Sequence, residues 1–155
     1  MAVTISPATE NDAALVYAFV RKLAEYENME HHVTSTEGDL RKWLFGERRV
    51  AEAVLARAGD TPVGCAVFFP IFSTYSGRPA IYIEDLIVEP EYRGSGVGRA
   101  LMDYLADLAR ERGCDRLNWS VLKWNRKAIG FYERLGAAVV DDWATYRLEV
   151  GGGRR

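Results

Sequence analysis

The chain has 155 residues, enough for one buried core, and its composition of 48% hydrophobic and 27% charged residues is that of a folded domain. Twenty Lys and Arg residues against 22 Asp and Glu residues give a formal charge of −2, which excludes the basic surface of a general nucleic-acid binder. Because no apolar stretch approaches about 18 residues and no signal-peptide pattern begins the chain, we expect a cytoplasmic protein without a membrane segment.

The first third of the chain begins with a strand and an amphipathic helix. Residues 3–6 form a short strand-like segment that Pro7 ends, and Thr9 with Asp12 forms a capping box. Apolar residues then recur at helical spacing, which predicts a helix over residues 10–26. These apolar residues are Leu15, Val16, Phe19, Val20 and Leu23.

A second helix and three strands follow. Thr36 and Asp39 form another capping box, and Gly46 ends the shorter helix that this box begins. The expected strands cover residues 50–57, 62–72 and 80–88. Turn sequences separate them, and the second strand is almost continuously apolar, which is typical of a central strand buried on both faces.

Helices and strands alternate in the C-terminal half. A glycine-rich segment, residues 92–99, precedes a strongly amphipathic helix that Gly113 ends. We then expect a strand over 117–122, a helix over 125–135, a strand pair over 137–150 that turns at Asp141 and Asp142, and a disordered tail over 151–155. The whole forms one domain over residues 1–150, of the α/β class, with a mixed sheet flanked by helices.

The glycine-rich segment carries the first functional signal. Gly94, Gly96 and Gly98 allow a close approach of the backbone to a ligand, and the helix that follows presents unpaired N–H groups with partial positive charge. Together these features predict a phosphate site. The spacing excludes a P-loop and a Gly-x-Gly-x-x-Gly dinucleotide motif, while a glycine turn without a ligand remains an alternative.

Four segments in a fixed order carry a resemblance that covers nearly the whole chain. They are Glu25–Met29, Tyr82–Leu86, Arg93–Gly98 with the pattern Arg-x-x-Gly-x-Gly, and Trp124–Asn125 followed by Phe131–Ala137. The chain resembles the GNAT superfamily of N-acetyltransferases, and within it the spermidine/spermine and thialysine acetyltransferase branch. The resemblance implies the GNAT fold, a mixed and mostly antiparallel sheet of six to seven strands with about four helices.

The resemblance also implies acetyl-CoA as cosubstrate, no metal, and a set of residues that hold the cosubstrate. The backbone of the strand before the loop would bind the pantetheine arm, and an amide near Leu86 and Ile87 would polarise the thioester carbonyl. The implied cosubstrate-binding residues are Leu86, Ile87, Val88, Arg93, Gly94, Ser95, Gly96, Val97, Gly98, Arg99, Asn125, Lys127, Ala128 and Tyr132.

Two residues are implied to take part in the chemistry. Tyr132 corresponds to the family's general acid, and a phenol, which ionises near pH 10, is a suitable proton donor for a departing thiolate. Glu84 is implied to bind the amine and to help take its proton through water. Taken without the family motif, Tyr132 would be a packing residue, and Asn125 would be the N-cap of its helix.

The implied acceptor site is acidic. Glu84 and Asp85 are adjacent on a strand, so we expect their side chains on opposite faces, with one of them in the acceptor cavity and an exposed strand end as the alternative. The acceptor-lining residues are implied to be Tyr26, Glu27, Glu84, Asp85, Asn118, Trp119 and Ser120. The acidic stretch that polyamine enzymes carry before their last strand is shortened here, which puts polyamine specificity in doubt.

These inferences predict an enzyme that acetylates a primary amine of a small molecule, such as thialysine, a diamine, a polyamine or a related amino acid, in a ternary complex. Acetylation of a protein or peptide and a non-catalytic acetyl-CoA sensor are the alternatives; Tyr132 together with Glu84 argues against the sensor. The resemblance also implies a homodimer. Cys65 and Cys114 are expected to be reduced thiols, and His31 and His32 to be surface residues.

Overall fold

The computed structural model describes residues 2–151 and divides into two compact units, Met1–Ser120 and Val121–Arg155. Residues 152–155 of the expected disordered tail lie outside the described part.

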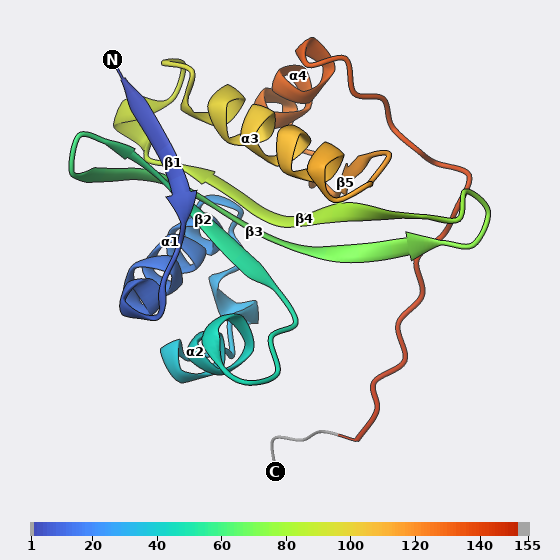
Figure 1. Cartoon of the computed structure of the whole chain (residues 1–155), viewed down its shortest axis with the longest axis horizontal. Coiled ribbons are helices and arrows are strands. Elements are labelled where there is room, and N and C mark those ends of the chain that lie inside the picture. Colours follow the sequence, from blue (N-terminus) through green and yellow to red (C-terminus); the bar gives the residue numbers. More distant parts are fainter. Residues whose placement is uncertain (1, 152–155) are drawn as a thin grey trace. The chain divides into compact units, whose positions relative to one another are not determined.

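The first unit contains three α-helices, five strands and three short 3-10 turns, in the order that the sequence predicts (Figure 1). The strands are β1 Val3–Pro7, β2 Glu52–Ala58, β3 Thr61–Ser73, β4 Arg78–Val88 and β5 Leu117–Trp119. The helices are α1 Ala13–Tyr26, α2 Glu37–Phe45 and α3 Val97–Glu111, and the 3-10 turns are Glu10–Asp12, Glu30–His32 and Pro90–Tyr92.

The predicted capping boxes begin the first two helical segments. The backbone N–H of Thr9 donates to the Asp12 carboxylate at 2.8 Å, and that of Thr36 donates to the Asp39 carboxylate at 2.9 Å. The Asp39 N–H donates in turn to the Thr36 hydroxyl oxygen at 3.2 Å. The Thr36 box is therefore reciprocal, whereas the Asp12 N–H donates to the carbonyl oxygen of Thr9 and not to its hydroxyl oxygen. These bonds satisfy N–H groups that a helix start leaves without partners.

The five strands form one mixed sheet in the order β1-β2-β3-β4-β5. The first three pairings are antiparallel, and the last, between β4 and β5, is parallel. A parallel pair needs a long crossover, which α3 supplies here. The α/β class and the mostly antiparallel sheet are confirmed, with five strands in the described residues where six to seven were expected.

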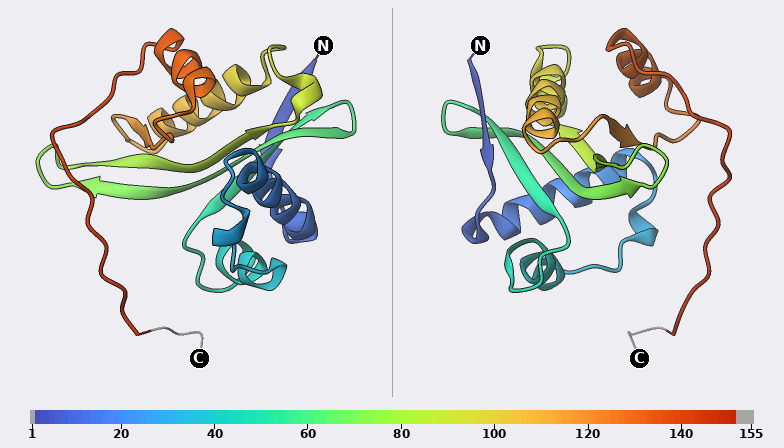
Figure 2. Two further views of the ribbon diagram at one scale, coloured as in Figure 1. Left: turned by 180° about the vertical axis from the view of Figure 1, so that it is seen from behind. Right: turned by 45° about the vertical axis from the view of Figure 1, so that its right-hand side comes forward.

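Helices cover both faces of this sheet, with α1 and α2 on one face and α3 on the other (Figures 1 and 2). The core under α1 and α2 consists of Val16, Phe19, Leu44, Ala53, Leu55, Cys65, Val67 and Ile87. On the other face α3 approaches β3 so closely that a side chain at Gly64 would lie 2.9 Å from the Ile87 carbonyl oxygen and 3.1 Å from Val97. The bare backbone of Gly64 therefore allows α3 to rest directly on the sheet.

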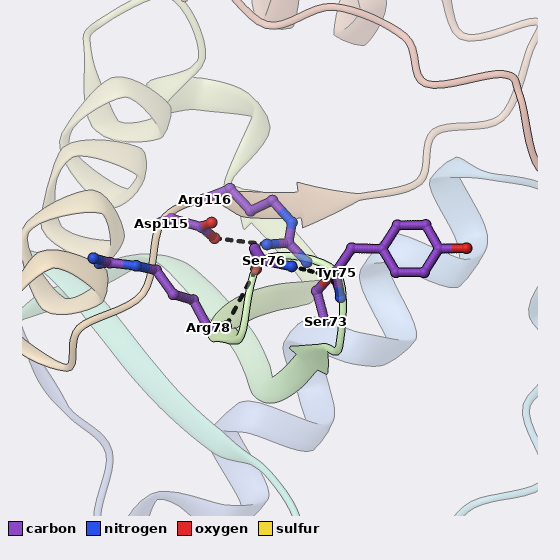
Figure 3. A network of polar contacts seen from close by, with 6 residues as sticks. All are labelled: Ser73, Tyr75, Ser76, Arg78, Asp115 and Arg116. Atoms are coloured by element: carbon purple, nitrogen blue, oxygen red, sulfur yellow. Dashed lines mark hydrogen bonds and ion pairs between the residues drawn. The ribbon is translucent and has the colours of Figure 1, made fainter.

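The β3–β4 hairpin ends in a turn held by its own serines (Figure 3). The Ser73 hydroxyl oxygen accepts hydrogen bonds from the backbone N–H groups of Tyr75 and Ser76, and the Ser76 hydroxyl oxygen accepts one from the Arg78 N–H. Gly77 completes the turn with a φ of +67°. The hairpin thus extends the sheet beyond the ends of β2 and β5.

The second unit contains α4, Arg126–Arg134, which Gly136 follows with a φ of +92°. Residues 137–150 form no strand, so the predicted final strand pair was wrong for this structure. Tyr146, Leu148 and Val150 alternate as in a strand but are 81–93% exposed. Alternating residues form a strand only where a neighbouring strand pairs with their backbone N–H and C=O groups. The described residues of the second unit contain no such neighbouring strand.

The cysteines and histidines lie as expected. Cys65 is buried, Cys114 is partly buried, and both are free thiols. His31 and His32 are exposed. None of the helices within residues 2–151 has the length and apolar character that crossing a bilayer requires.

Candidate functional site

The glycine-rich loop leaves open space above its backbone. Gly94 and Gly96 have φ values of +79° and +94°, which side-chain-bearing residues rarely adopt. A Cβ atom built on either residue would meet no other atom within 4 Å. These glycines are therefore required by the turn, and the space above them is free for a ligand.

The N-terminus of α3 points its first amides at this loop. Gly96 is the N-cap, and the N–H of Ala100 donates to the Gly96 carbonyl in the first helical hydrogen bond, at 2.9 Å. The N–H groups of residues 97–99 therefore have no partner inside the helix. Val97 is buried and can offer a ligand only its backbone, and the Arg99 side chain pairs with Asp103 at 3.3 Å on the surface.

Arg93 and Ser95 shape the loop from within. The Arg93 Nε donates to the Val88 carbonyl oxygen at 3.2 Å, and its guanidinium carbon lies 4.6 Å from the centre of the Tyr26 ring. The Ser95 hydroxyl and backbone N–H both donate to the Tyr92 carbonyl. Ser95 thus braces the turn, and Arg93 ties the turn to the end of β4.

An open pocket of about 470 Å³ lies between the end of α1 and the end of β4. Its lining combines cationic, acidic and apolar groups, with the ion pair of Lys22 and Glu89 across it. The lining residues are Lys22, Glu25, Tyr26, Ile87, Val88, Glu89, Pro90, Glu91 and Arg93. The structure therefore brings the predicted residues Tyr26, Ile87, Val88 and Arg93 to one pocket.

The second half of β4 has an open edge. β5 pairs only with Ile81–Ile83, and within residues 2–151 no strand pairs with Glu84–Val88 on that side. The Glu89 N–H donates to the Val63 carbonyl of β3, so by alternation the backbone groups of Ile87 face β3 and those of Leu86 and Val88 face the open edge. The Leu86 N–H, the Leu86 carbonyl and the Val88 N–H are thus presented there.

A β-bulge corrects the expectation that Glu84 and Asp85 point to opposite faces. Ile83 pairs with Phe68 and Asp85 with the adjacent Val67, so Glu84 is an extra residue on β4. The bulge changes the alternation, and Asp85 joins Val67 on the face covered by α1. The Glu84 carboxylate lies close enough to Glu27, at the end of α1, for its charge to raise the pKa of Glu27.

Three carboxylates therefore gather between β4 and the end of α1. Partial burial, and then the Glu84 charge, raise the pKa of Glu27. Burial, followed by the charges of Glu84 and Glu27, raises the pKa of Asp85 to about 7. Asp85 is consequently poised to exchange a proton near neutral pH. Among residues 2–151, no group of three His, Cys, Asp or Glu side chains is placed to hold a metal ion.

The raised pKa of Asp85 leads to a prediction about stability. The folded protein holds this proton up to about pH 7, whereas the unfolded chain releases it near the ordinary value of 3.8, so stability falls as pH rises between these values. We expect Asp85→Asn, which mimics the neutral acid, to raise the unfolding free energy at pH 8 by on the order of 3 kcal/mol and to change it far less at pH 4. Urea unfolding at both pH values measures this; a variant less stable than wild type at pH 8 would contradict the prediction.

The other predicted acceptor residues divide between two places. Tyr26 stacks on Arg93 beside the pocket, whereas the neighbouring Glu27 joins the carboxylates. Trp119 is the last β5 residue to pair with β4, and Asn118 pairs with Tyr82. The hydroxyl groups of Ser120 and Tyr82 lie 2.7 Å apart. Sequence reasoning quoted Tyr82 within the motif Tyr82–Leu86 but gave it no role in the site, although an aromatic residue two positions before Glu84 was the available signal.

The remaining predicted residues lie on α4. Asn125 is the N-cap, as predicted, and its side-chain oxygen accepts a hydrogen bond from the Ala128 N–H at 3.2 Å. Lys127 and Ala128 form the first turn, and Tyr132 follows near the end of the helix with its ring 5.4 Å from that of Phe131.

The comparison with protein families gives the class of protein that carries this fold and glycine loop. The model of the acetyltransferase (GNAT) family matches residues 17–137. The chain therefore belongs to the acetyltransferase (GNAT) family, and the protein is an acyltransferase enzyme.

The relatives of this chain share most of its length. Thialysine N-epsilon-acetyltransferase of Sus scrofa is 35% identical over 158 residues, covering 95% of this chain and 92% of that protein. L-ornithine N5-acetyltransferase of Arabidopsis thaliana is 25% identical, with coverage of 91% and 82%. Among solved structures, an integron cassette protein from V. cholerae has a TM-score of 0.78 at 29% identity, covering 97% of this chain and 94% of that one.

Proposed function

We propose that the protein transfers an acetyl group from acetyl-CoA to a primary amine of a small cationic molecule, such as thialysine, a diamine, a polyamine or a related amino acid. One observation carries the choice of acceptor: Glu27, Glu84 and Asp85 gather beside a strand edge that leads directly into the glycine loop. Relatives that act on thialysine and ornithine support the same acceptor class.

The loop and the open edge of β4 fit a nucleotide thioester. The N–H groups of Gly94 and Gly96 and of residues 97–99 would bind the diphosphate, because the positive φ values and the free space above the glycines leave the backbone accessible. The edge groups of Leu86 and Val88 would hold the pantetheine arm as an added strand. Acetyl-CoA supplies the acetyl group as a thioester. The Leu86 N–H, which faces this edge, would polarise the thioester carbonyl in preference to that of Ile87, which faces β3.

The carboxylates would bind the acceptor and manage its proton. An ammonium group is attracted to the negative charge on Glu27 and Glu84, and its arrival favours the ionised form of Asp85. Acceptor binding thus releases the proton of Asp85, and the cluster gains charge where the cation sits. Glu84 would then accept the amine proton, through water, so that the neutral amine attacks directly in the ternary complex.

Groups of α4 complete the proposal. Tyr132 would donate a proton to the departing thiolate, and Asn125, Lys127 and Ala128 would contact the cosubstrate near the start of the helix. A homodimer remains an expectation from the resemblance.

The proposal is tested with a panel of amines and a variant of Glu84. Wild-type protein with acetyl-CoA should release free thiol with small cationic amines. We expect Glu84→Gln to lower kcat/KM for the acceptor about a hundredfold while the KM for acetyl-CoA stays unchanged. Glu111→Gln, at an exposed residue at the end of α3, serves as the control and should behave as wild type.

Two outcomes would contradict the proposal. Turnover with peptides but with no small amine would assign the protein to peptide acetylation, the activity named for a Brucella melitensis relative that acts on a ribosomal-protein alanine, 27% identical with a TM-score of 0.75. Loss of acetyl-CoA binding in Glu84→Gln, with acceptor use intact, would remove Glu84 from the acceptor site.

A further inference from the structure

The parallel pair of β4 and β5 is firmly tied at the end near the hairpin. The Ile81 N–H donates to the Arg116 carbonyl at 3.2 Å, and the Asp115 N–H donates to the Pro79 carbonyl at 3.4 Å. The side chains of Asp115 and Arg116 also form an ion pair of 2.6 Å there (Figure 3). This end therefore does not depend on any contact near the glycine loop.

The other end of the pair is where the two strands part. Ile83 and Trp119 form the last backbone pair, and beyond them the Tyr82 and Ser120 hydroxyl groups meet at 2.7 Å. The Tyr82 ring is itself fixed by stacking on Phe69, with the ring centres 5.3 Å apart and the planes inclined by 29°. The Tyr82 side chain, whose ring is held by Phe69, thus extends across the point where the strands separate and contacts Ser120, the first residue after β5.

This contact lies between the two halves of the candidate site. Strand alternation up to the bulge places Tyr82 on the same face as Glu84, two residues later. The open edge at Leu86 and Val88 begins directly after the bulge. The position at which β5 leaves β4 therefore determines how far the open edge extends toward Glu84.

We propose that Tyr82 and Ser120 are a positioning pair: their hydroxyl–hydroxyl bond fixes the point at which β5 separates from β4, and so fixes the acyl donor on the open edge relative to the carboxylates. This inference rests on the proposed function for its catalytic consequence. Its structural consequence, the position of the strand end, follows from the β4–β5 pairing and the Tyr82–Ser120 bond alone. Small displacements of reacting groups lower catalytic rates strongly, so the loss of one surface hydrogen bond becomes measurable.

Four variants separate this role from simple packing. Tyr82→Phe keeps the stack on Phe69 and removes the hydroxyl, and Ser120→Ala removes its partner. We expect each to lower kcat about three- to tenfold with an unchanged KM for the acceptor. The double variant should be no slower than the slower single one, because both remove the same bond. Ser120→Thr retains a hydroxyl and should keep at least about half of the wild-type kcat.

Hydrogen exchange supplies a readout that does not require turnover. In Tyr82→Phe, amides of residues 117–120 should exchange faster than in wild type, while those of β1 and β2 remain unchanged. Equal exchange in the two proteins at 117–120, additive losses of kcat in the double variant, or a Ser120→Thr enzyme as slow as Ser120→Ala would each overturn the positioning pair. A wild-type protein that acetylates no amine would instead count against the proposed function.

Discussion

Tyr132→Phe is expected to lower kcat by about tenfold to a thousandfold while acetyl-CoA binds almost as in wild type. The substitution removes one oxygen and leaves the ring beside Phe131 on α4. If that oxygen carries the proton for the departing thiolate, the loss falls on the chemical step and leaves binding intact. Steady-state kinetics from pH 6 to 9, together with calorimetric titration of acetyl-CoA, measures the two effects separately.

Tyr75→Phe is the matched control for this experiment. Tyr75 is 88% exposed at the tip of the β3–β4 hairpin, so losing its hydroxyl should leave kcat unchanged. An unchanged kcat in Tyr132→Phe at every pH would remove Tyr132 from the mechanism. An equal loss of acetyl-CoA affinity and of kcat/KM would give it a binding role instead.

Gly96→Val should abolish detectable binding of CoA and acetyl-CoA. Gly96 has a φ of +94°, which a branched residue adopts only under strain, and the open space above it is where the diphosphate is proposed to lie. A valine would both disturb the turn and fill that space. Calorimetric titration with CoA gives the affinity, and thermal unfolding shows whether the fold is retained.

Gly113→Val separates the two effects. Gly113 follows the other end of α3 with a φ of +75° and likewise has no atom within 4 Å of a built Cβ. Its replacement should therefore lower the melting temperature to a similar extent while CoA still binds. If a folded Gly96→Val protein binds CoA with wild-type affinity, the loop is not the diphosphate site.

Local chemistry made the helices and the central strands predictable. The Thr36 capping box forms in full, and the Thr9 box forms through the Asp12 carboxylate alone. The apolar run over residues 62–72 becomes β3, whose residues Val63–Phe68 are all buried. These features depend on neighbouring residues, so the sequence itself determines them.

Features that depend on distant pairing were not predictable in the same way. The bulge at Glu84 arises from the register between β3 and β4, and the residue types of β4 do not predict it. The expected strand over 117–122 shortens to Leu117–Trp119 because β4 pairs with it over three residues only. The expected strands in 137–150 illustrate the same limit. Alternation of apolar and polar residues shows which side chains would share a face of a strand, but it does not show which neighbouring strand would pair with it.

The sequence predicted which residues belong to the candidate site, and the structure corrected how some of them are arranged. The loop glycines, Arg93, Glu27 and Asp85 were named from motifs, and the structure places each of them at a pocket, a turn or the carboxylate cluster. Which of Leu86 and Ile87 presents its N–H at the open edge could be decided only from the hydrogen-bond register of β4. The contact of Tyr82 could be recognised only once the position of Ser120, which lies 38 residues away in the chain, was known.

The extra residue in β4 also decides where the strand can change in length. Deleting the codon of Glu84 would close the bulge and leave Asp85 opposite Val67, whereas deleting that of Leu86 would rotate every later residue of the strand by half a turn of the pleat. Ile87 would then leave the core, and the edge amides would turn inward. The residues after the bulge should thus accept exchanges of residue type over evolutionary time while keeping their number constant.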